Sequence, residues 1–167
     1  TTRTAGFNSI DQFSLSDSSK FLTVVLMFIG AAPASTGGGI KVTTMAAVAS
    51  GIISDIKHRP SLILSGHYVR KSTSRRAYTI FTLSMLIVLA STIFISIVEN
   101  DILSSPTISF LDILVEVGSA FGTVGLTSIG TANLHLSSHV VLIICMFLGR
   151  VSPVAFAISL TRPQEET

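Results

Sequence analysis

The sequence predicts an all-α membrane protein built from repeated units of helix, re-entrant helix, glycine-centred loop and helix. Three observations lead to this fold class. Apolar residues make up 48% of the 167 residues and charged residues only 12%, and the mean hydropathy is +0.69. Long apolar stretches recur along the chain, and two polar loops centred on glycine resemble each other. The alternative, a soluble protein with a large buried core, fits the low charge content and the long apolar stretches poorly.

The first apolar stretch, residues 21–56, is predicted to be a broken helix. A continuous helix of this length would measure about 54 Å, whereas the hydrocarbon core is about 30 Å thick. The stretch also contains Pro33 and three consecutive glycines, which a continuous helix accommodates poorly. We expect one helix from Phe21 to about Ala32 and a second from about Val42 to Ile56. The irregular backbone between them, at membrane depth, is tolerated only against protein or a water-filled cavity, which indicates a pore or transport path.

A basic connection, residues 57–76, follows the broken helix. Six of the 11 Lys and Arg residues of the chain lie in it: Lys57, Arg59, Arg70, Lys71, Arg75 and Arg76. The positive-inside rule predicts that this connection is cytoplasmic.

The second apolar stretch, Tyr78–Val98, has 21 residues and no charge, which is the length of a spanning helix. Glu99 and Asp101 would then lie outside. The third stretch, Val140–Leu160, is interrupted only at Gly149 and Arg150 and is predicted to cross back.

A shorter apolar segment, Ile108–Phe121, would span only about 21 Å as a helix, which is too short to cross the membrane. We expect a re-entrant helix; an amphipathic helix lying on the surface is the alternative. Asp112 and Glu116 lie one turn apart on it. Whether they face an outer cavity or bond within the protein stays open at this stage.

An internal repeat relates the two glycine-centred loops, "TRTAGFNSID" and "GTVGLTSIG". A shift of 119 positions, which brings Gly6 onto Gly125, superimposes them without a gap. The ten identities are Thr4, Gly6, Ser9, Ile10, Leu15, Ser18, Ser19, Met27, Phe28 and Gly30 with Thr123, Gly125, Ser128, Ile129, Leu134, Ser137, Ser138, Met146, Phe147 and Gly149. Duplicated units are common in transport proteins.

The repeat divides the chain into four parts. Residues 1–56 are predicted to hold the glycine-centred loop and broken inner helix of one unit, whose earlier helices are missing, so that the second-last unit is truncated. Residues 57–76 form the cytoplasmic connection, residues 77–161 a complete unit, and residues 162–167 a cytoplasmic tail. Several such units would have to surround a closed pore.

The two loops have the chemistry of a cation filter. Backbone carbonyls in a narrow loop replace the hydration shell of a cation without adding net charge. Glycine permits a positive φ, so that consecutive carbonyls can point toward one axis. The threonines at positions 4 and 123 add hydroxyl groups. The carboxyl end of the short helix would favour a cation near the membrane centre.

The motifs "TRTAGFNSID", "MFIGAAPASTGGGIKVTT", "GTVGLTSIG" and "MFLGRVSP" together resemble the Ktr/Trk/HKT superfamily of potassium transporters, and most closely the C-terminal portion of a Ktr-type membrane-spanning subunit. The resemblance covers nearly the whole chain. It implies a pseudo-fourfold pore with one filter loop per unit, with the third unit ending at about residue 56 and the fourth following. Ala34 and Ser152 depart from the family pattern, which often has glycine at both places.

The resemblance also assigns roles to residues. The implied filter residues are Thr4, Ala5, Gly6, Phe7, Thr123, Val124, Gly125 and Leu126. The implied intramembrane gate comprises Ala34, Ser35, Thr36, Gly37, Gly38, Gly39 and Lys41, with Arg150 of the last helix contacting it. Buried charges in membrane segments are usually functional, and this favours a functional role for Arg150. A charge at a helix end can instead extend to the interface, so both interpretations stay open for Lys41, which lies beside the loop.

The resemblance implies a multi-pass protein of a bacterial cell membrane that takes up K⁺, with Na⁺ as a candidate coupling ion and no covalently bound cofactor. The expected partners are the remaining pore units of the same subunit, a second copy in a homodimer, a cytosolic nucleotide-binding regulatory ring and the lipid membrane, with no nucleic acid. We expect no enzyme activity. The alternative is a non-transporting membrane protein, such as an intramembrane hydrolase or an assembly scaffold, in which the glycines serve helix packing.

Other motifs carry less weight. The segment "GGGIKVTT" lacks the spacing of a phosphate-binding loop, because Ile40 separates Gly39 from Lys41. No histidine lies in an apolar segment where it could activate Ser35 as a nucleophile. His135 and His139 have helical spacing but no third ligand for a metal.

Overall fold

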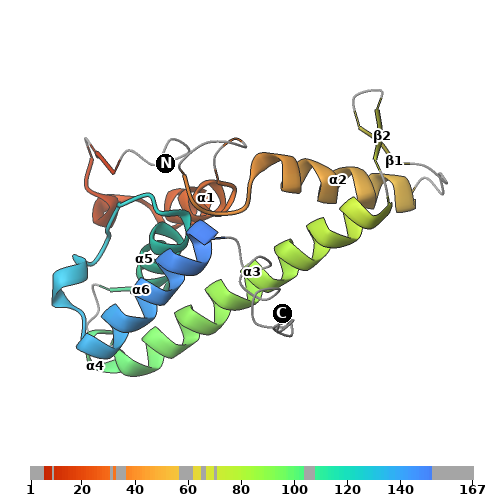
Figure 1. Ribbon diagram of the computed structural model, residues 1–167. Helices are drawn as coiled ribbons and strands as arrows, with labels where there is room; N and C mark the ends of the chain where they lie inside the picture. The colour runs from red at the N-terminus through yellow and green to blue at the C-terminus, as the bar shows by residue number, and fades with distance from the viewer. Residues whose placement is uncertain are drawn as a thin grey trace, which may run out of the picture.

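The computed structural model describes residues 6–8, 10–30, 32, 37–56, 62–64, 67–69, 71–103 and 108–151. Within these ranges the chain is helical except for one small hairpin (Figure 1). The elements are η1 (Gln12–Ser14), α1 (Asp17–Phe28), α2 (Val42–Ile56), β1 (Leu62–Leu64), β2 (His67–Val69), α3 (Lys71–Val98), α4 (Asn100–Leu103), α5 (Phe110–Gly122), η2 (Thr131–Asn133) and α6 (Leu136–Val151).

Helix α3 is the long axis around which the other helices are arranged (Figure 1). Helix α2 packs against the first part of α3, and α5 and α6 pack against its second part. Helix α1 lies against α5 on the side away from α6. The short helix α5 is therefore enclosed by the three helices α1, α3 and α6.

The break in the first apolar stretch is confirmed. Helix α1 ends at Phe28, and α2 begins at Val42, the predicted residue. Helix α1 ends before Ala32 because the chain pairs with itself there: the Gly30 N–H donates to the Ile40 carbonyl (2.8 Å), and the Ile40 N–H donates to the Phe28 carbonyl (3.1 Å). These bonds tie the two ends of the intervening loop together.

The second apolar stretch forms a helix longer than predicted. Helix α3 begins at Lys71, so that the end of the basic connection is also helical. Its segment Ser74–Val98 is long and apolar enough to span a membrane, and only 22% of its most apolar part is buried, unlike the core helix of a soluble protein. In the part of the chain that the structure describes, α2 and α6 are apolar but shorter. The predicted end of the third stretch at Leu160 lies outside the described residues.

The basic connection contains a hairpin that the sequence analysis did not predict. Strands β1 and β2 pair antiparallel, with Leu62 opposite Val69 and Leu64 opposite His67. Each strand has only three residues, which is too short to show the alternating pattern from which a strand is predicted.

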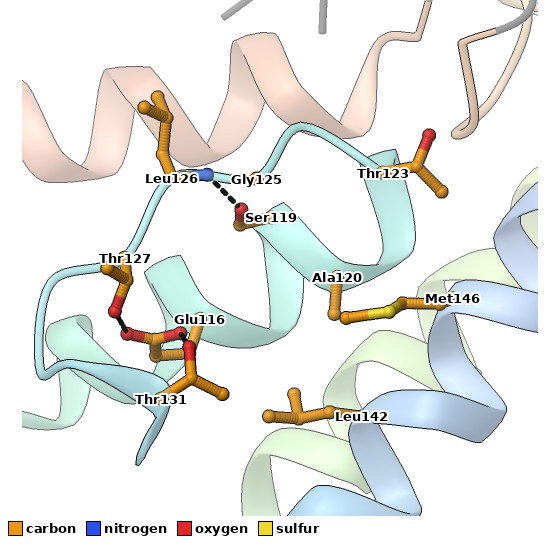
Figure 2. Close-up of a pocket in the computed structure, with 10 residues that line it drawn as sticks. All are labelled: Glu116, Ser119, Ala120, Thr123, Gly125, Leu126, Thr127, Thr131, Leu142 and Met146. Atoms are coloured by element: carbon orange, nitrogen blue, oxygen red, sulfur yellow. Dashed lines mark hydrogen bonds between the residues drawn. The ribbon is translucent and has the colours of Figure 1, made fainter. Parts of the chain in front are cut away.

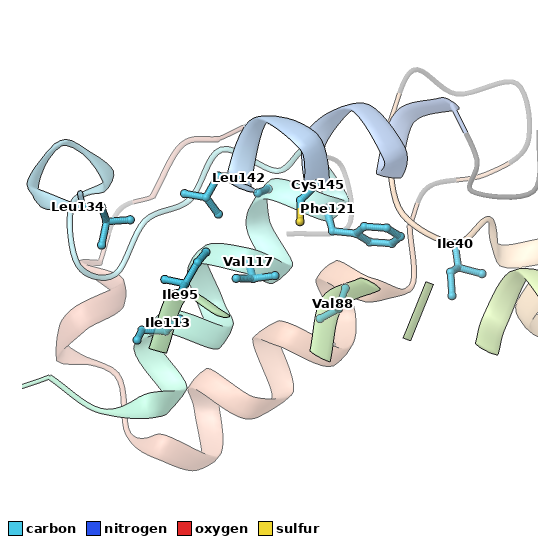
Figure 3. Close-up of a cluster of buried hydrophobic side chains, with 10 residues drawn as sticks. Ile40, Val88, Ile95, Ile113, Val117, Phe121, Leu134, Leu142 and Cys145 are labelled. Carbon is cyan, nitrogen blue, oxygen red and sulfur yellow. The ribbon is translucent and has the colours of Figure 1, made fainter. Parts of the chain in front are cut away.

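The core forms between α3, α5 and α6 (Figure 3). Its buried side chains include Val88 and Ile95 from α3, Ile113, Val117 and Phe121 from α5, and Leu142 and Cys145 from α6. The ring of Phe28 at the end of α1 stacks on that of Phe121, with 6.0 Å between the ring centroids.

Helix α5 is the most enclosed helix of this core. Apart from Leu114, every residue from Asp112 to its end at Gly122 is buried. A capping box holds its first turn: the Ser109 side chain accepts from a backbone N–H, and Asp112 accepts from the Ser109 N–H (2.9 Å). The alternative of an amphipathic surface helix at residues 108–121 is therefore wrong.

Candidate functional site

In the described part of the two candidate filter loops, residues 4–7 and 123–126, Gly6 of the first lies against Val124 and Gly125 of the second. A Cβ atom on Gly6 would lie 3.2 Å from the Val124 carbonyl oxygen, and one on Gly125 would lie 3.5 Å from the Gly6 Cα. Both glycines have positive φ angles, 71° and 84°, as the filter prediction requires. Phe7 is exposed, whereas Thr4 and Ala5 lie outside the described residues.

The second candidate filter loop begins directly at the carboxyl end of α5. Thr123 is the C-cap and has a left-handed backbone with a φ of 50°. This is a rare conformation for a β-branched residue, and such strain is typical of functional sites. The Val124 N–H donates to the Ser119 carbonyl, and the Leu126 N–H donates to the Ser119 hydroxyl, both at 2.9 Å (Figure 2).

Past the second candidate filter loop, residues 127–131 form what we call the outer limb. Its polar groups are held by two carboxylates of α5. Glu116 Oε1 accepts from the N–H groups of Ser128 (3.0 Å) and Ile129 (3.1 Å) and from the Thr127 hydroxyl, and Oε2 accepts from the Thr131 hydroxyl (3.2 Å) (Figure 2).

Asp112 holds the same limb from the next turn of α5. It accepts from the Ser128 hydroxyl and forms an ion pair with Lys20 Nζ of α1 at 2.7 Å. Lys20 and Asp112 are both buried. The question that the sequence left open is thereby answered: Asp112 and Glu116 bond within the protein.

Glu99 links the end of α3 to the start of α6. It is completely buried, and it accepts hydrogen bonds from the His135 N–H (2.7 Å) and the Ser138 hydroxyl (2.6 Å) while its other oxygen contacts His135 Nδ1 (2.8 Å). Burial pushes the pKa of Glu99 up, but the hydrogen bonds from Ser138 and His135 outweigh it and hold the pKa below its ordinary value. The hydrogen bond and charge of Glu99 raise the pKa of His135.

His139 completes this outer arrangement, because its Nε2 lies 2.7 Å from the Thr131 carbonyl at the end of the outer limb. The two histidines are thus occupied by hydrogen bonds. Among the described residues no group of three or more His, Cys, Asp or Glu side chains could hold a metal ion.

The candidate gate loop, residues 34–41, contacts the base of the second candidate filter loop. The Gly38 N–H donates to the Thr123 hydroxyl (2.8 Å), and the Gly39 N–H donates to the Gly149 carbonyl of α6 (3.2 Å). Lys41 Nζ donates to the Gly37 carbonyl within the loop (2.7 Å). Ala34, Ser35 and Thr36 lie outside the described residues.

Arg150 lies on α6 near this loop, and its predicted contact with the gate stays a prediction. With Gly39, Lys41 and Ser84 it lines a small cavity of about 50 Å³. Its side chain is exposed, whereas the neighbouring Gly149 carbonyl accepts the hydrogen bond that the Gly39 N–H of the loop donates to α6. The sequence analysis did not predict this contact of Gly149, because no charged or polar side chain marks a backbone contact in the sequence.

Close backbone packing explains the glycine at position 149. A Cβ atom there would lie 1.9 Å from the Phe121 carbonyl oxygen at the end of α5. At the equivalent position of the repeat, a Cβ atom on Gly30 would lie 2.0 Å from the Gly38 carbonyl oxygen. Gly149 therefore allows the end of α5 to approach within backbone contact, and Gly30 does the same for the gate loop.

A cavity of about 310 Å³ lies beside the second candidate filter loop (Figure 2). Its lining includes Glu116, Thr123 and Gly125, and Leu142 and Met146 of α6. It lies where α6 and the loop diverge, and the part of the chain described here leaves it unfilled.

Comparison with known proteins places this arrangement among cation transporters. The whole chain, residues 1–167, matches the family described as TrkH, cation transport protein. It is 34% identical over 165 residues to the Ktr system potassium uptake protein B of Bacillus subtilis (strain 168) and 33% identical over 162 residues to the protein of the same name from Vibrio alginolyticus. It is 35% identical over 161 residues to the potassium/sodium uptake protein NtpJ of Enterococcus hirae.

These matches cover 99%, 97% and 96% of this chain but only 36%, 34% and 35% of the respective relatives. The chain thus spans about a third of their length. The fold is similar to the crystal structure of the potassium transporter TrkH from Vibrio parahaemolyticus, with a TM-score of 0.71 and 21% sequence identity over 96% of this chain and 35% of that chain.

Proposed function

The chain belongs to the TrkH family of cation transport proteins, and on that premise we propose that it forms part of the membrane-spanning subunit of a potassium uptake system. The observation that carries the proposal is the contact between two glycine-centred loops with positive φ angles, at Gly6 and Gly125. The relatives that bear the names of potassium uptake proteins support K⁺ as the transported ion. The name of the Enterococcus hirae relative includes sodium, which keeps Na⁺ as the candidate coupling ion.

In the proposed pore, Thr4–Phe7 and Thr123–Leu126 are the filter segments of two neighbouring units. Carbonyl groups of both loops would replace the hydration shell of the ion. The approach of Gly6 to the Val124 carbonyl supports this arrangement, because two filter segments that share one ion path must lie at close range. The remaining units of the pore would come from the rest of the subunit, since relatives are about three times as long as this chain.

The candidate gate loop is proposed to close the path below the filter. Its support is the pair of bonds from Gly38 to Thr123 and from Gly39 to Gly149, which hold the loop against the base of the second filter segment. Arg150 would act together with Lys41 as positive charge at this constriction, because cations there repel K⁺.

The proposed location is a bacterial cell membrane. Apolar side chains exposed on α3 and α6 would face lipid or the other pore units: Met85, Leu86, Leu89, Ile93, Phe94 and Ile97 on α3, and Val140, Ile143, Ile144, Met146 and Phe147 on α6. With the basic connection 57–76 cytoplasmic, Glu99 and the outer limb would lie on the external side.

The further partners stay proposals. The word "system" in the names of the Ktr relatives supports a regulatory component, for which we propose a cytosolic nucleotide-binding ring, with the subunit as a homodimer. Within a family of transporters, the hydrolase and scaffold alternatives have no support.

The filter assignment is tested by Gly125→Ser and Gly6→Ser in the complete transporter that contains this chain. A side chain at a φ of 84° or 71° is strained, so the loop carbonyls should shift and K⁺ should lose its advantage over Na⁺. Gly118→Ser is the control for an added side chain, because Gly118 lies outside the filter segment and a Cβ there would lie 3.5 Å from Val24 Cγ1, an ordinary contact distance. Uptake of K⁺ and Na⁺ into liposomes gives the ratio. An unchanged ratio in both filter variants would overturn the assignment.

A further inference from the structure

We propose that Glu116 is a positioning residue for ion selection, whose buried carboxylate fixes the outer limb, residues 127–131, on α5. The inference rests on the proposed function, because it concerns the selectivity of the same filter. Glu116 supplies no carbonyl to the proposed filter but holds the outer limb, which directly follows the second filter segment.

The contacts of Glu116 are unusual in number and in distribution. The side chain is only 4% exposed, and its two oxygens together accept from two backbone N–H groups and two hydroxyl groups. All four donors belong to a single stretch of five residues, which has no helix or strand until Thr131, the first residue of η2. A carboxylate is the acceptor best suited to consecutive N–H groups, since it accepts only and its charge strengthens each bond.

Glu116 is the middle member of a row on α5. Asp112, Glu116 and Ser119 follow helical spacing, so they lie on one face of the helix. Ser119 accepts from the Leu126 N–H, Glu116 from the N–H groups of Ser128 and Ile129, and Asp112 from the Ser128 hydroxyl. The loop therefore runs back along α5, one helical turn per contact.

Between Leu126 and Gly130, four N–H groups are satisfied by side chains rather than by backbone carbonyls. The N–H groups of Leu126, Ser128 and Ile129 all donate to side chains of α5, and that of Gly130 donates to the Thr127 hydroxyl (2.9 Å). An irregular segment at membrane depth needs such acceptors for every donor. Its shape consequently depends on the length and position of the accepting side chains, and Glu116 supplies the most bonds.

The position of the Glu116 carboxylate and its charge have different effects on ion selection. A negative charge near the pore attracts any cation and would favour K⁺ and Na⁺ alike. A shift of the outer limb would instead move the carbonyls at Val124 and Gly125, two to three residues before the contacts of Glu116. Only the positional role predicts a change in the ratio of the two ions, and only the positional role depends on the length of the side chain.

The experiment measures K⁺ and Na⁺ uptake into liposomes that hold the complete transporter. Glu116→Gln removes the charge, Glu116→Asp keeps the charge but shortens the side chain, and Thr131→Val removes one donor and leaves Glu116 in place. Glu99→Gln is the matched control, because Glu99 is also a buried carboxylate with several hydrogen bonds but caps α6, away from the filter. The K⁺-to-Na⁺ ratio is compared at equal protein density.

We expect Glu116→Gln and Glu116→Asp each to lower the ratio about tenfold, which corresponds to about 1.4 kcal/mol. Thr131→Val should lower it less, about two- to fivefold, since one bond of several is lost. Glu99→Gln should keep the ratio of the parent. A parent that does not favour K⁺ would overturn the proposed function itself.

With a selective parent, the inference fails if both Glu116 variants keep the parental ratio. It also fails if Glu116→Asp keeps the ratio while Glu116→Gln loses it, because the effect would then not depend on the length of the side chain. If neither Glu116 variant folds, Thr127→Val and Thr131→Val decide the matter, and the parental ratio in both would overturn the inference.

Discussion

Replacing Gly149 by Ala tests whether the backbone contact between α6 and the end of α5 holds the site together. Intrinsic helix propensity alone favours Ala over Gly by about 1 kcal/mol in a helix interior, so the substitution should stabilise an isolated helix. In the protein, the new Cβ would lie 1.9 Å from the Phe121 carbonyl oxygen and 2.8 Å from the Phe121 carbonyl carbon. Real Cβ contacts do not reach such distances, and both atoms are backbone, so α6 and α5 must move apart.

The cost follows from that separation. Overpacking in a well-packed core costs typically 1–3 kcal/mol, and a backbone neighbour cannot escape by changing its rotamer. The movement also lengthens the 3.2 Å bond from the Gly39 N–H to the Gly149 carbonyl, which contributes about 1 kcal/mol. These losses exceed the gain in propensity, so we expect a net loss of about 1–3 kcal/mol.

Gly118→Ala is the matched control. Gly118 lies within α5, and a Cβ there would lie 3.5 Å from Val24 Cγ1, an ordinary contact distance. The same substitution should therefore leave the stability unchanged or raise it by up to about 1 kcal/mol. The two variants differ only in what surrounds the added methyl group.

The assay is the thermal midpoint of the purified complete transporter in detergent, followed by the fraction that remains monodisperse after heating. Gly149→Ala should melt below the parent and Gly118→Ala at or above it. If Gly149→Ala melted at the same temperature as Gly118→Ala or above it, the backbone contact and the reasoning built on it would be refuted.

Three further predictions follow from the site. Thr123→Ala should raise K⁺ flux, because the Gly38 N–H of the gate loop loses its acceptor at 2.8 Å. Thr123→Ser keeps the hydroxyl and should keep the parental flux. Equal flux in both variants would count against the bond between Gly38 and Thr123 as part of the gate. Arg150→Ala should also raise the flux of a correctly folded transporter by removing positive charge from the constriction; an unchanged or lower flux would remove Arg150 from the gate. Protonated His135 stabilises the fold, because its pKa is raised above the ordinary 6.5. This contribution is present below the ordinary value and is lost as the pH rises through the raised pKa. The loss of thermal stability on raising the pH through this range should therefore be smaller in His135→Gln than in the parent, and an equal loss would contradict the ion pair with Glu99.

The helices were predictable because hydropathy and helix breakers report them directly. Pro33 and the glycines that follow predicted the broken helix, and α2 has the predicted bounds Val42–Ile56. The start of α3 at Lys71 was missed, since hydropathy marks where a helix is apolar and not where it begins. The positive φ angles of Gly6 and Gly125 followed from the repeat, whereas the left-handed Thr123 did not, because its residue type disfavours that conformation.

The polar contacts were not predictable from spacing. Glu116 bonds to residues 11–15 positions away in an irregular loop, for which no periodic pattern exists. In the sequence, Glu99 marked only the end of an apolar stretch. Its partners His135 and Ser138 could not be predicted, because they lie 36 and 39 positions further along the chain. Lys20 is buried and therefore needs a partner, which is Asp112, but the sequence alone did not show that Lys20 is buried.

Because Gly30 pairs with Ile40, the length of the gate loop can change without a change in the helices on either side of it. The backbone bonds of Ile40 with Gly30 and Phe28 fix where α1 ends and where α2 begins, independently of the length of the loop between them. Closing a loop becomes costlier only slowly with length, by about 0.6 kcal/mol for each doubling. Insertions and deletions within residues 31–36 are therefore the least costly changes near the proposed pore, because Gly37 and Gly38 are already held by other bonds. Relatives that differ in how freely they pass ions should differ in the length and composition of this segment before they differ in the helices that flank it.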